Sequence, residues 1–120
     1  MHVSVNSSID RISSDARESI SQMIQGTLAR FSSSISQVRV QIIDENGPRG
    51  GEDKICRVNL MMPGLGLVTA SAKHEKVMAA VAEAARRTRR IVVAKLKRRQ
   101  DIGRRAKQGR LLEASELLEV

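Results

Sequence analysis

The chain has 120 residues and a formal net charge of +8 at pH 7, with 21 Lys and Arg against 13 Asp and Glu. This length supports one compact domain, and no apolar run approaches the roughly 18 residues of a membrane-spanning helix. The single cysteine, Cys56, excludes an internal disulfide. Acidic and basic residues balance in the first sixty positions, so the whole positive excess lies in residues 61–120. Such a charge suits a polyanion, and without a membrane segment or leader-like start we expect a cytoplasmic protein that binds nucleic acid.

The N-terminal quarter predicts a strand followed by a helix. Residues 2–6, "HVSVN", alternate polar and apolar side chains, which is the period of a half-buried strand. Ser13 and Ser14 are candidates for an N-cap. After them, apolar residues recur every three or four positions, as on one face of an amphipathic helix: Ala16, Ile20, Met23, Ile24, Leu28 and Phe31.

The central segment predicts three further strands. Residues 36–44 and 55–62 alternate again, with Arg39 on the outward side of the first and Arg57 on that of the second, and Cys56 inward as a small buried thiol. "PGLG", residues 63–66, suits a tight turn, and residues 67–72 continue as a third strand. These strands predict a hairpin-linked meander.

The C-terminal half predicts a long helix from about Lys73 to Arg99, rich in Ala and without Gly or Pro. Its apolar face is expected to cover the sheet, which gives an α+β fold of order β-α-β-β-β-α, with two helices packed on one face of a four-stranded sheet. We assign residues 1–100 to this domain. Residues 101–120 form a basic and then acidic extension, predicted either as a short helix or as a disordered tail that folds on a partner.

The outward face of this predicted helix is strongly basic. Lys76, Arg87, Arg90 and Lys97 fall close to one line, Arg86 and Arg98 flank it, and no acid lies between Arg86 and Arg99. Like charges at spacings of three and four residues repel each other. A solvated face kept for solubility is one interpretation, but the unbroken run favours a phosphate-binding ridge whose affinity falls with salt. Arg104, Arg105, Lys107 and Arg110 continue the basic run.

The composition narrows the kind of nucleic acid. Phe31 is the only aromatic residue of the Phe, Tyr and Trp class, and its place on the helix stripe predicts a core position. Base stacking of the kind used by single-strand binders is therefore not expected, and no helix-turn-helix spacing, zinc ligands or basic heptads are visible. Recognition of backbone and shape remains, as suits folded RNA.

Catalytic and metal sites are not predicted. His2 and His74 lie on separate elements, and the acids of the 44–54 loop do not have the spacing of a calcium-binding loop and are mixed with Arg49 and Lys54, which favours local charge balance. No nucleophile, base and orienting group occur at a recognisable spacing. We therefore expect no enzyme activity, no cofactor, no metal and no small-molecule substrate.

One segment resembles a known family. Residues 30–60, "RFSSSISQVRVQIIDENGPRGGEDKICRVNL", are similar to the hibernation-promoting factors, also called the sigma-54 modulation or ribosome-associated inhibitor family, in short form. The similarity is strongest in the D-E-N-G-x-x-G-G-x-D-K loop, residues 44–54, and covers roughly residues 1–100, including the order of elements and the basic final helix.

The resemblance implies a ribosome-binding translation inhibitor of stressed or stationary-phase cells. Such proteins occupy the mRNA and tRNA channel of the small ribosomal subunit and contact rRNA through the basic face of the last helix. The corresponding residues here are Lys76, Arg86, Arg87, Arg90, Lys97 and Arg98, with Arg89, Lys95 and Arg99 as neighbours.

The sheet and the loop add further candidates for RNA contact. Arg39 and Arg57 extend the positive surface across the uncovered sheet face, or simply supply the polar residues that an exposed face needs. Arg49 and Lys54 either touch RNA or belong to a connector that joins two strands.

Two other functions stay open: a general double-stranded RNA or DNA module, and a transcription-related sigma-54 modulation protein. Long family members carry a second domain that pairs ribosomes, for which this chain has no room. Self-association and the role of residues 101–120 are left undetermined by the sequence.

Overall fold

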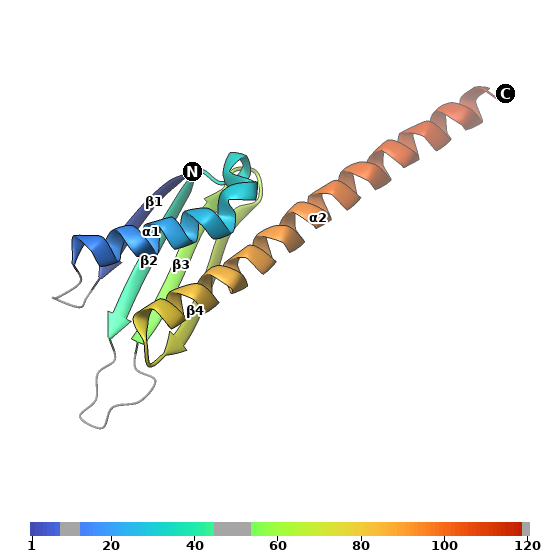
Figure 1. Cartoon of the computed structure of the whole chain (residues 1–120). Coiled ribbons are helices and arrows are strands. Elements are labelled where there is room, and N and C mark those ends of the chain that lie inside the picture. Colours follow the sequence, from blue (N-terminus) through green and yellow to red (C-terminus); the bar gives the residue numbers. More distant parts are fainter. Residues whose placement is uncertain (8–12, 45–53, 119–120) are drawn as a thin grey trace.

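The computed structural model describes residues 1–7, 13–44 and 54–118, with side chains described as far as residue 103. Its elements follow each other as in Figure 1. They are β1 (His2–Ser7), α1 (Ser14–Leu28), the 3-10 helix η1 (Ala29–Ser34), β2 (Gln37–Asp44), β3 (Lys54–Met62), β4 (Gly66–His74) and α2 (Val77–Leu118).

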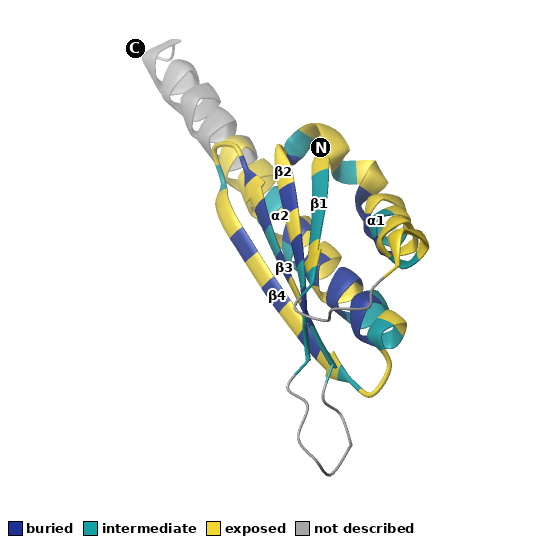
Figure 2. Ribbon diagram, turned by 90° about the vertical axis from the view of Figure 1, so that its left-hand side faces the viewer, coloured by how far each residue is buried: buried dark blue, intermediate teal, exposed yellow. Residues whose placement is uncertain are grey.

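The strands form one mixed sheet in the order β1-β2-β3-β4. β1 runs parallel to β2, and the other neighbours are antiparallel. A parallel pair needs a crossover connection, which here contains α1. Both helices lie on the same side of the sheet (Figure 2), and the predicted β-α-β-β-β-α order is confirmed.

Helix α1 begins at the predicted cap. The hydroxyl of Ser13 accepts a hydrogen bond from the backbone N–H of Ala16 at 3.1 Å, which satisfies one of the unpaired donors of the first turn. The apolar stripe then buries Ile20, Ile24 and Leu28 completely. The α-helix ends at Leu28, so Phe31 lies in η1, where it is half-buried and packs against the core. The predicted core position of Phe31 is therefore only partly correct.

The core lies between the sheet and the helices. Val40, Val58 and Val68 occupy neighbouring strands and are almost fully buried, and Cys56 is buried among them as predicted. The surface of α2 that faces the core consists largely of small residues. These are Ala80, Ala84, Ala85 and the buried Thr88, whose hydroxyl donates to the Ala84 carbonyl at 2.7 Å. Small side chains allow the helix to pack close against the sheet, and the internal hydrogen bond satisfies the buried hydroxyl of Thr88.

The bounds of α2 differ from the sequence prediction at both ends. Lys73 and His74 pair with Ile55 and Lys54 of β3, so the strand continues through His74 and the helix begins only at Val77. At its other end the helix continues to Leu118 instead of ending at about Arg99. Its 42 residues span about 63 Å at 1.5 Å per residue, so its second half extends past the sheet (Figure 1). The division into a domain and an extension at residue 100 stays a prediction.

The turn between β3 and β4 depends on two glycines. Gly64 has φ of 82° and Gly66 has φ of 94°, a region that side chains with a Cβ avoid. The Leu65 N–H donates to the Met62 carbonyl at 2.9 Å and closes the turn. The predicted turn at residues 63–66 is confirmed.

Candidate nucleic-acid interface

The exposed side of α2 carries a cluster of cations that we call the basic ridge. At 100° per residue, Arg86, Arg90 and Lys97 fall within about 40° of one another, on the side away from the sheet. Arg89 is exposed beside them, and Arg98 and Arg99 are exposed on other sides of the same stretch of helix, where both line a hollow with Leu65 and Lys95. The basic ridge consists of Arg86, Arg89, Arg90, Lys97, Arg98 and Arg99 and extends about 20 Å along the helix.

The charge of the basic ridge is not offset within the described part of the chain. The nearest acids along the helix are Glu83 and Asp101, at its two ends. None of the six side chains makes an ion pair with another described residue. Among the described residues of α2, Glu83 pairs with Arg87, which is not part of the basic ridge. Repulsion among the guanidinium groups is relieved when anions bind, so the surface favours a polyanion.

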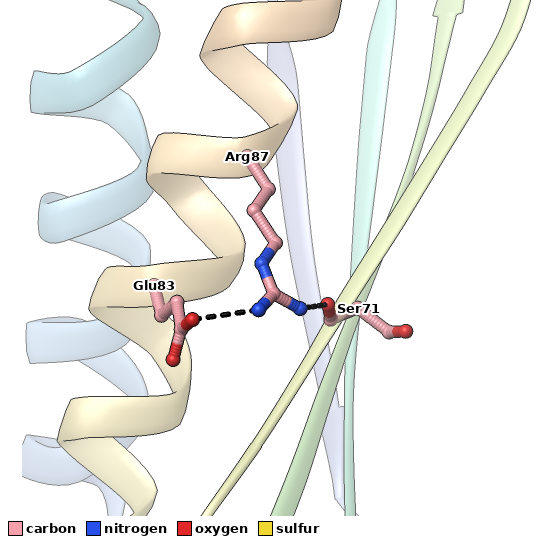
Figure 3. Close-up of polar contacts among 3 residues, drawn as sticks. All are labelled: Ser71, Glu83 and Arg87. Atoms are coloured by element: carbon pink, nitrogen blue, oxygen red, sulfur yellow. Dashed lines mark hydrogen bonds and ion pairs between the residues drawn. The ribbon is translucent and has the colours of Figure 1, made fainter.

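Two of the predicted RNA-binding cations make hydrogen bonds within the fold, and their contact with RNA stays a prediction. Arg87 donates to the Ser71 carbonyl and to the Glu83 carboxylate, each at 2.7 Å (Figure 3). Lys95 donates to the carbonyl of Leu65, in the β3–β4 turn, at 3.1 Å. Both hold α2 on the edge of the sheet, and Arg86, Arg90 and Lys97 of the basic ridge lie on the opposite side of the helix as outward-facing charge.

Lys76 lies apart from the basic ridge. It precedes α2, and its backbone N–H donates to the His74 ring nitrogen Nδ1 at 3.2 Å. The side chain is exposed. It is separated from Lys97 by about 31 Å of helix length, so a ligand that contacts both must be long.

Arg39 and Arg57 are exposed, but on the other face of the sheet. Arg39 pairs with Asn59 across β2 and β3, and Arg57 pairs with Gln41, so the two guanidinium groups are diagonal neighbours on the uncovered face. This face is opposite to the helices (Figure 2). Arg39 and Arg57 thus lie on the uncovered sheet face as expected, across the domain from the basic ridge, and their contact with RNA stays a prediction.

The two candidates in the 44–54 loop offer less support for an RNA contact. Lys54 forms a 2.7 Å ion pair with Asp44 at the end of the β2–β3 hairpin, so its charge is offset within the fold. Arg49 lies outside the described residues, as do the other acids of the 44–54 loop.

Sequence reasoning missed Arg30. It is exposed in η1 and lines a groove together with Arg89 and Lys97 of α2. A helical projection does not place Arg30, because α1 has already ended at Leu28. Only the packing of η1 beside α2 brings these cations together.

Other chemistry is sparse in the described residues. Burial raises the pKa of the Cys56 thiol to about 12, which keeps it protonated and unreactive. No group of three or more His, Cys, Asp or Glu in the described ranges could hold a metal ion. Within the same ranges, no helix has the length and apolar character needed to cross a bilayer.

The fold and the surface together define a small α+β domain that presents an exposed cationic helix. No protein-family model and no curated relative matches the chain. Several solved structures do match the chain. One is a ribosomal subunit interface protein from Coxiella burnetii, with a TM-score of 0.61 and 20% identity over 81% of this chain and 98% of that one. Another is the Protein Y N-terminal domain from Thermus thermophilus, with a TM-score of 0.57 and 19% identity over 77% and 96%. At such identity the likeness establishes a shared fold, and the fold implied by the sequence resemblance is confirmed.

Proposed function

We propose that this protein is a non-enzymatic translation inhibitor of the hibernation-promoting family. In this proposal it binds in the mRNA and tRNA channel of the small ribosomal subunit, in the cytoplasm, and its basic ridge contacts rRNA. The observation that carries the proposal is the basic ridge itself, an exposed cationic row on a helix held rigidly against a sheet. The loop resemblance and the fold shared with a ribosomal subunit interface protein point to the ribosome as the source of the RNA.

Backbone recognition explains why the ridge is built of arginine. A guanidinium group presents up to five donors in a plane and binds phosphate oxygens in pairs. A helix that is anchored through Arg87 and Lys95 presents those groups without reordering the backbone. With rRNA phosphates bound along the ridge, the protein itself would occupy the space that a translating messenger or tRNA needs.

The proposal is tested by sedimentation of the full chain with ribosomes in sucrose gradients. At low salt the protein should move with the small subunit, and rising salt should release it. Arg90→Glu should shift it to the top of the gradient. Arg17→Glu, which makes the same change in net charge at an exposed position on α1, should leave it bound. Wild-type protein found wholly at the top, or equal behaviour of the two variants, would overturn the proposal.

Occupation of the channel has its own test. Small subunits preloaded with messenger and tRNA should exclude the protein, whereas empty subunits should bind it, and a cell-free translation reaction should slow as the protein is added. Binding that is indifferent to preloading would place the contact elsewhere on the subunit.

A general duplex-binding module is the second candidate, because an arginine row reads backbone without reading sequence. Bulk double-stranded RNA or DNA separates the two: it should displace a general module from ribosomes and leave a channel-specific one in place. A transcription role predicts instead that polymerase or sigma subunits are captured with the protein after nuclease treatment.

A further inference from the structure

A groove of about 500 Å³ separates η1 from the middle of α2. Its volume lies within the range of roughly 300–1,000 Å³ that small-ligand sites occupy. The lining residues are Arg30, Phe31, Arg89, Val93, Leu96, Lys97 and Gln100.

The groove combines apolar walls with cationic groups. Phe31 and Leu96 are half-buried and pack against the core, and they supply apolar surface. Arg30, Arg89 and Lys97 are exposed and carry positive charge. None of the described residues that line the groove carries a carboxylate. An anionic ligand with a flat apolar part therefore fits its chemistry better than a simple ion does.

Val93 strengthens this argument. Its side chain is 41% exposed, although it lies in the middle of the basic ridge. It also lines a neighbouring hollow with Arg86, Arg89 and Arg90. A solvated charged face gains nothing from a valine at that point, whereas a ligand that carries both apolar and anionic parts contacts the valine and the surrounding cations together.

We propose that this groove binds one unpaired nucleotide, with its base against Phe31, Val93 and Leu96 and its phosphate on Arg30, Arg89 and Lys97. The amide of Gln100 can donate to and accept from the edge of the base. A duplex cannot supply such a ligand, because its bases are stacked and paired. The inference rests on the proposed function only for the source of the nucleotide, a splayed-out residue of ribosomal RNA. A free mononucleotide has the same chemistry.

Phe31 provides a direct probe. It is the only Phe in a chain without Tyr or Trp, so the NMR signals of its ring protons do not overlap with those of another Phe, Tyr or Trp ring. We would titrate the full chain with AMP and GMP, with a 5′-phosphorylated single-stranded tetranucleotide, and with a blunt-ended RNA duplex long enough to stay fully paired. Contact with a base should shift the Phe31 signals through the base's ring current.

Each arm has a defined meaning. Shifts with the tetranucleotide at concentrations where mononucleotides give none support the groove and assign an RNA source. Shifts of equal size at equal concentration with AMP or GMP support the groove and assign a free nucleotide. Duplex RNA that shifts Phe31 as much as the single strand does would overturn the inference, as would binding of the tetranucleotide without any shift. Equal shifts with phosphatidylglycerol vesicles would also overturn it, in favour of a lipid surface.

Two matched pairs of variants isolate the groove from general electrostatics. Val93→Ser keeps every charge and should weaken tetranucleotide binding about three- to tenfold through lost apolar contact. Met78→Ser, at an exposure of 37% on the same helix, should not weaken it. Arg30→Gln should weaken binding more than Arg17→Gln does. If Val93→Ser matches the wild type, the groove proposal fails.

The groove and the ribosome proposal can fail separately. If the groove variants bind the tetranucleotide normally but the wild type still sediments with small subunits, only the groove is wrong. If Phe31 responds to single-stranded RNA but the protein never sediments with ribosomes, only the ribosomal source is wrong.

Discussion

Arg87 of α2 donates a hydrogen bond to the backbone carbonyl of Ser71 in β4 at 2.7 Å and holds Glu83 at the same distance through its other nitrogen (Figure 3). β4 is one of the two edge strands of the sheet, and this bond fastens the helix to it. A cation that the sequence groups with the RNA-binding row therefore serves the fold.

Arg87→Ala should lower the free energy of unfolding by about 1 kcal/mol, because a charge-assisted hydrogen bond is lost and the half-exposed ion pair adds little. Arg90→Ala, one helical turn away and exposed, should stay within about 0.5 kcal/mol of the wild type. Urea unfolding followed by circular dichroism measures both. Equal stability of the two variants would show that Arg87 does not stabilise the fold.

The salt dependence of RNA binding should separate ridge cations from paired ones. Arg90→Ala should reduce the slope of log K against log salt by about one, as expected when one phosphate contact is lost. Lys54→Gln should change the slope much less, because Asp44 already offsets that charge at 2.7 Å. Filter binding at several salt concentrations gives the slopes. A larger change for Lys54→Gln would place the contact at the β2–β3 end of the sheet.

Glycine replacements should act in opposite directions at two positions. Gly64→Ala should destabilise the protein by about 1 kcal/mol, because φ of 82° strains a residue with a Cβ. Gly26→Ala should stabilise it by about 0.5–1 kcal/mol, because Gly26 lies within α1 and an added Cβ there meets nothing within 4 Å. Thermal unfolding reports both changes. A shift of the same sign for both would contradict the turn geometry.

The thiol of Cys56 should make stability depend on alkaline pH. Burial raises its pKa from an ordinary value of 9.0 to about 12, so the folded state holds the proton more tightly than the unfolded chain does. Its contribution is complete below pH 9 and is lost as pH rises from there toward 12. The free energy of unfolding should therefore fall more steeply between pH 9 and pH 10.5 for the wild type than for Cys56→Ala. Parallel curves for the two proteins would show that the thiol is not shielded as the structure has it.

Much of the fold could be predicted from local patterns. The alternation around Val38, Val40 and Ile42 placed β2, and the stripe of Ile20, Ile24 and Leu28 placed α1. Patterns failed at boundaries where a partner decides. β4 continues through His74 because β3 supplies hydrogen-bonding partners there. A helical projection, which considers one segment at a time, cannot predict that pairing.

The site could be predicted only in part. The acid-free run from Arg86 to Arg99 pointed to α2, and the exposed side of that helix carries the basic ridge. Membership of the groove could not be predicted, because Arg30 and Lys97 are far apart in the chain and meet only where η1 packs beside α2.

Local pattern was enough to predict the periodic elements and the positive charge of the last helix, since both depend on neighbours within a few residues. The packing of the folded chain sets which cations face outward, which donate hydrogen bonds to Ser71 or Leu65, and which share a groove with Phe31. The physical reason is that side-chain partners depend on how a helix is rotated and seated on the sheet. That seating is set by core packing among residues distant in the chain.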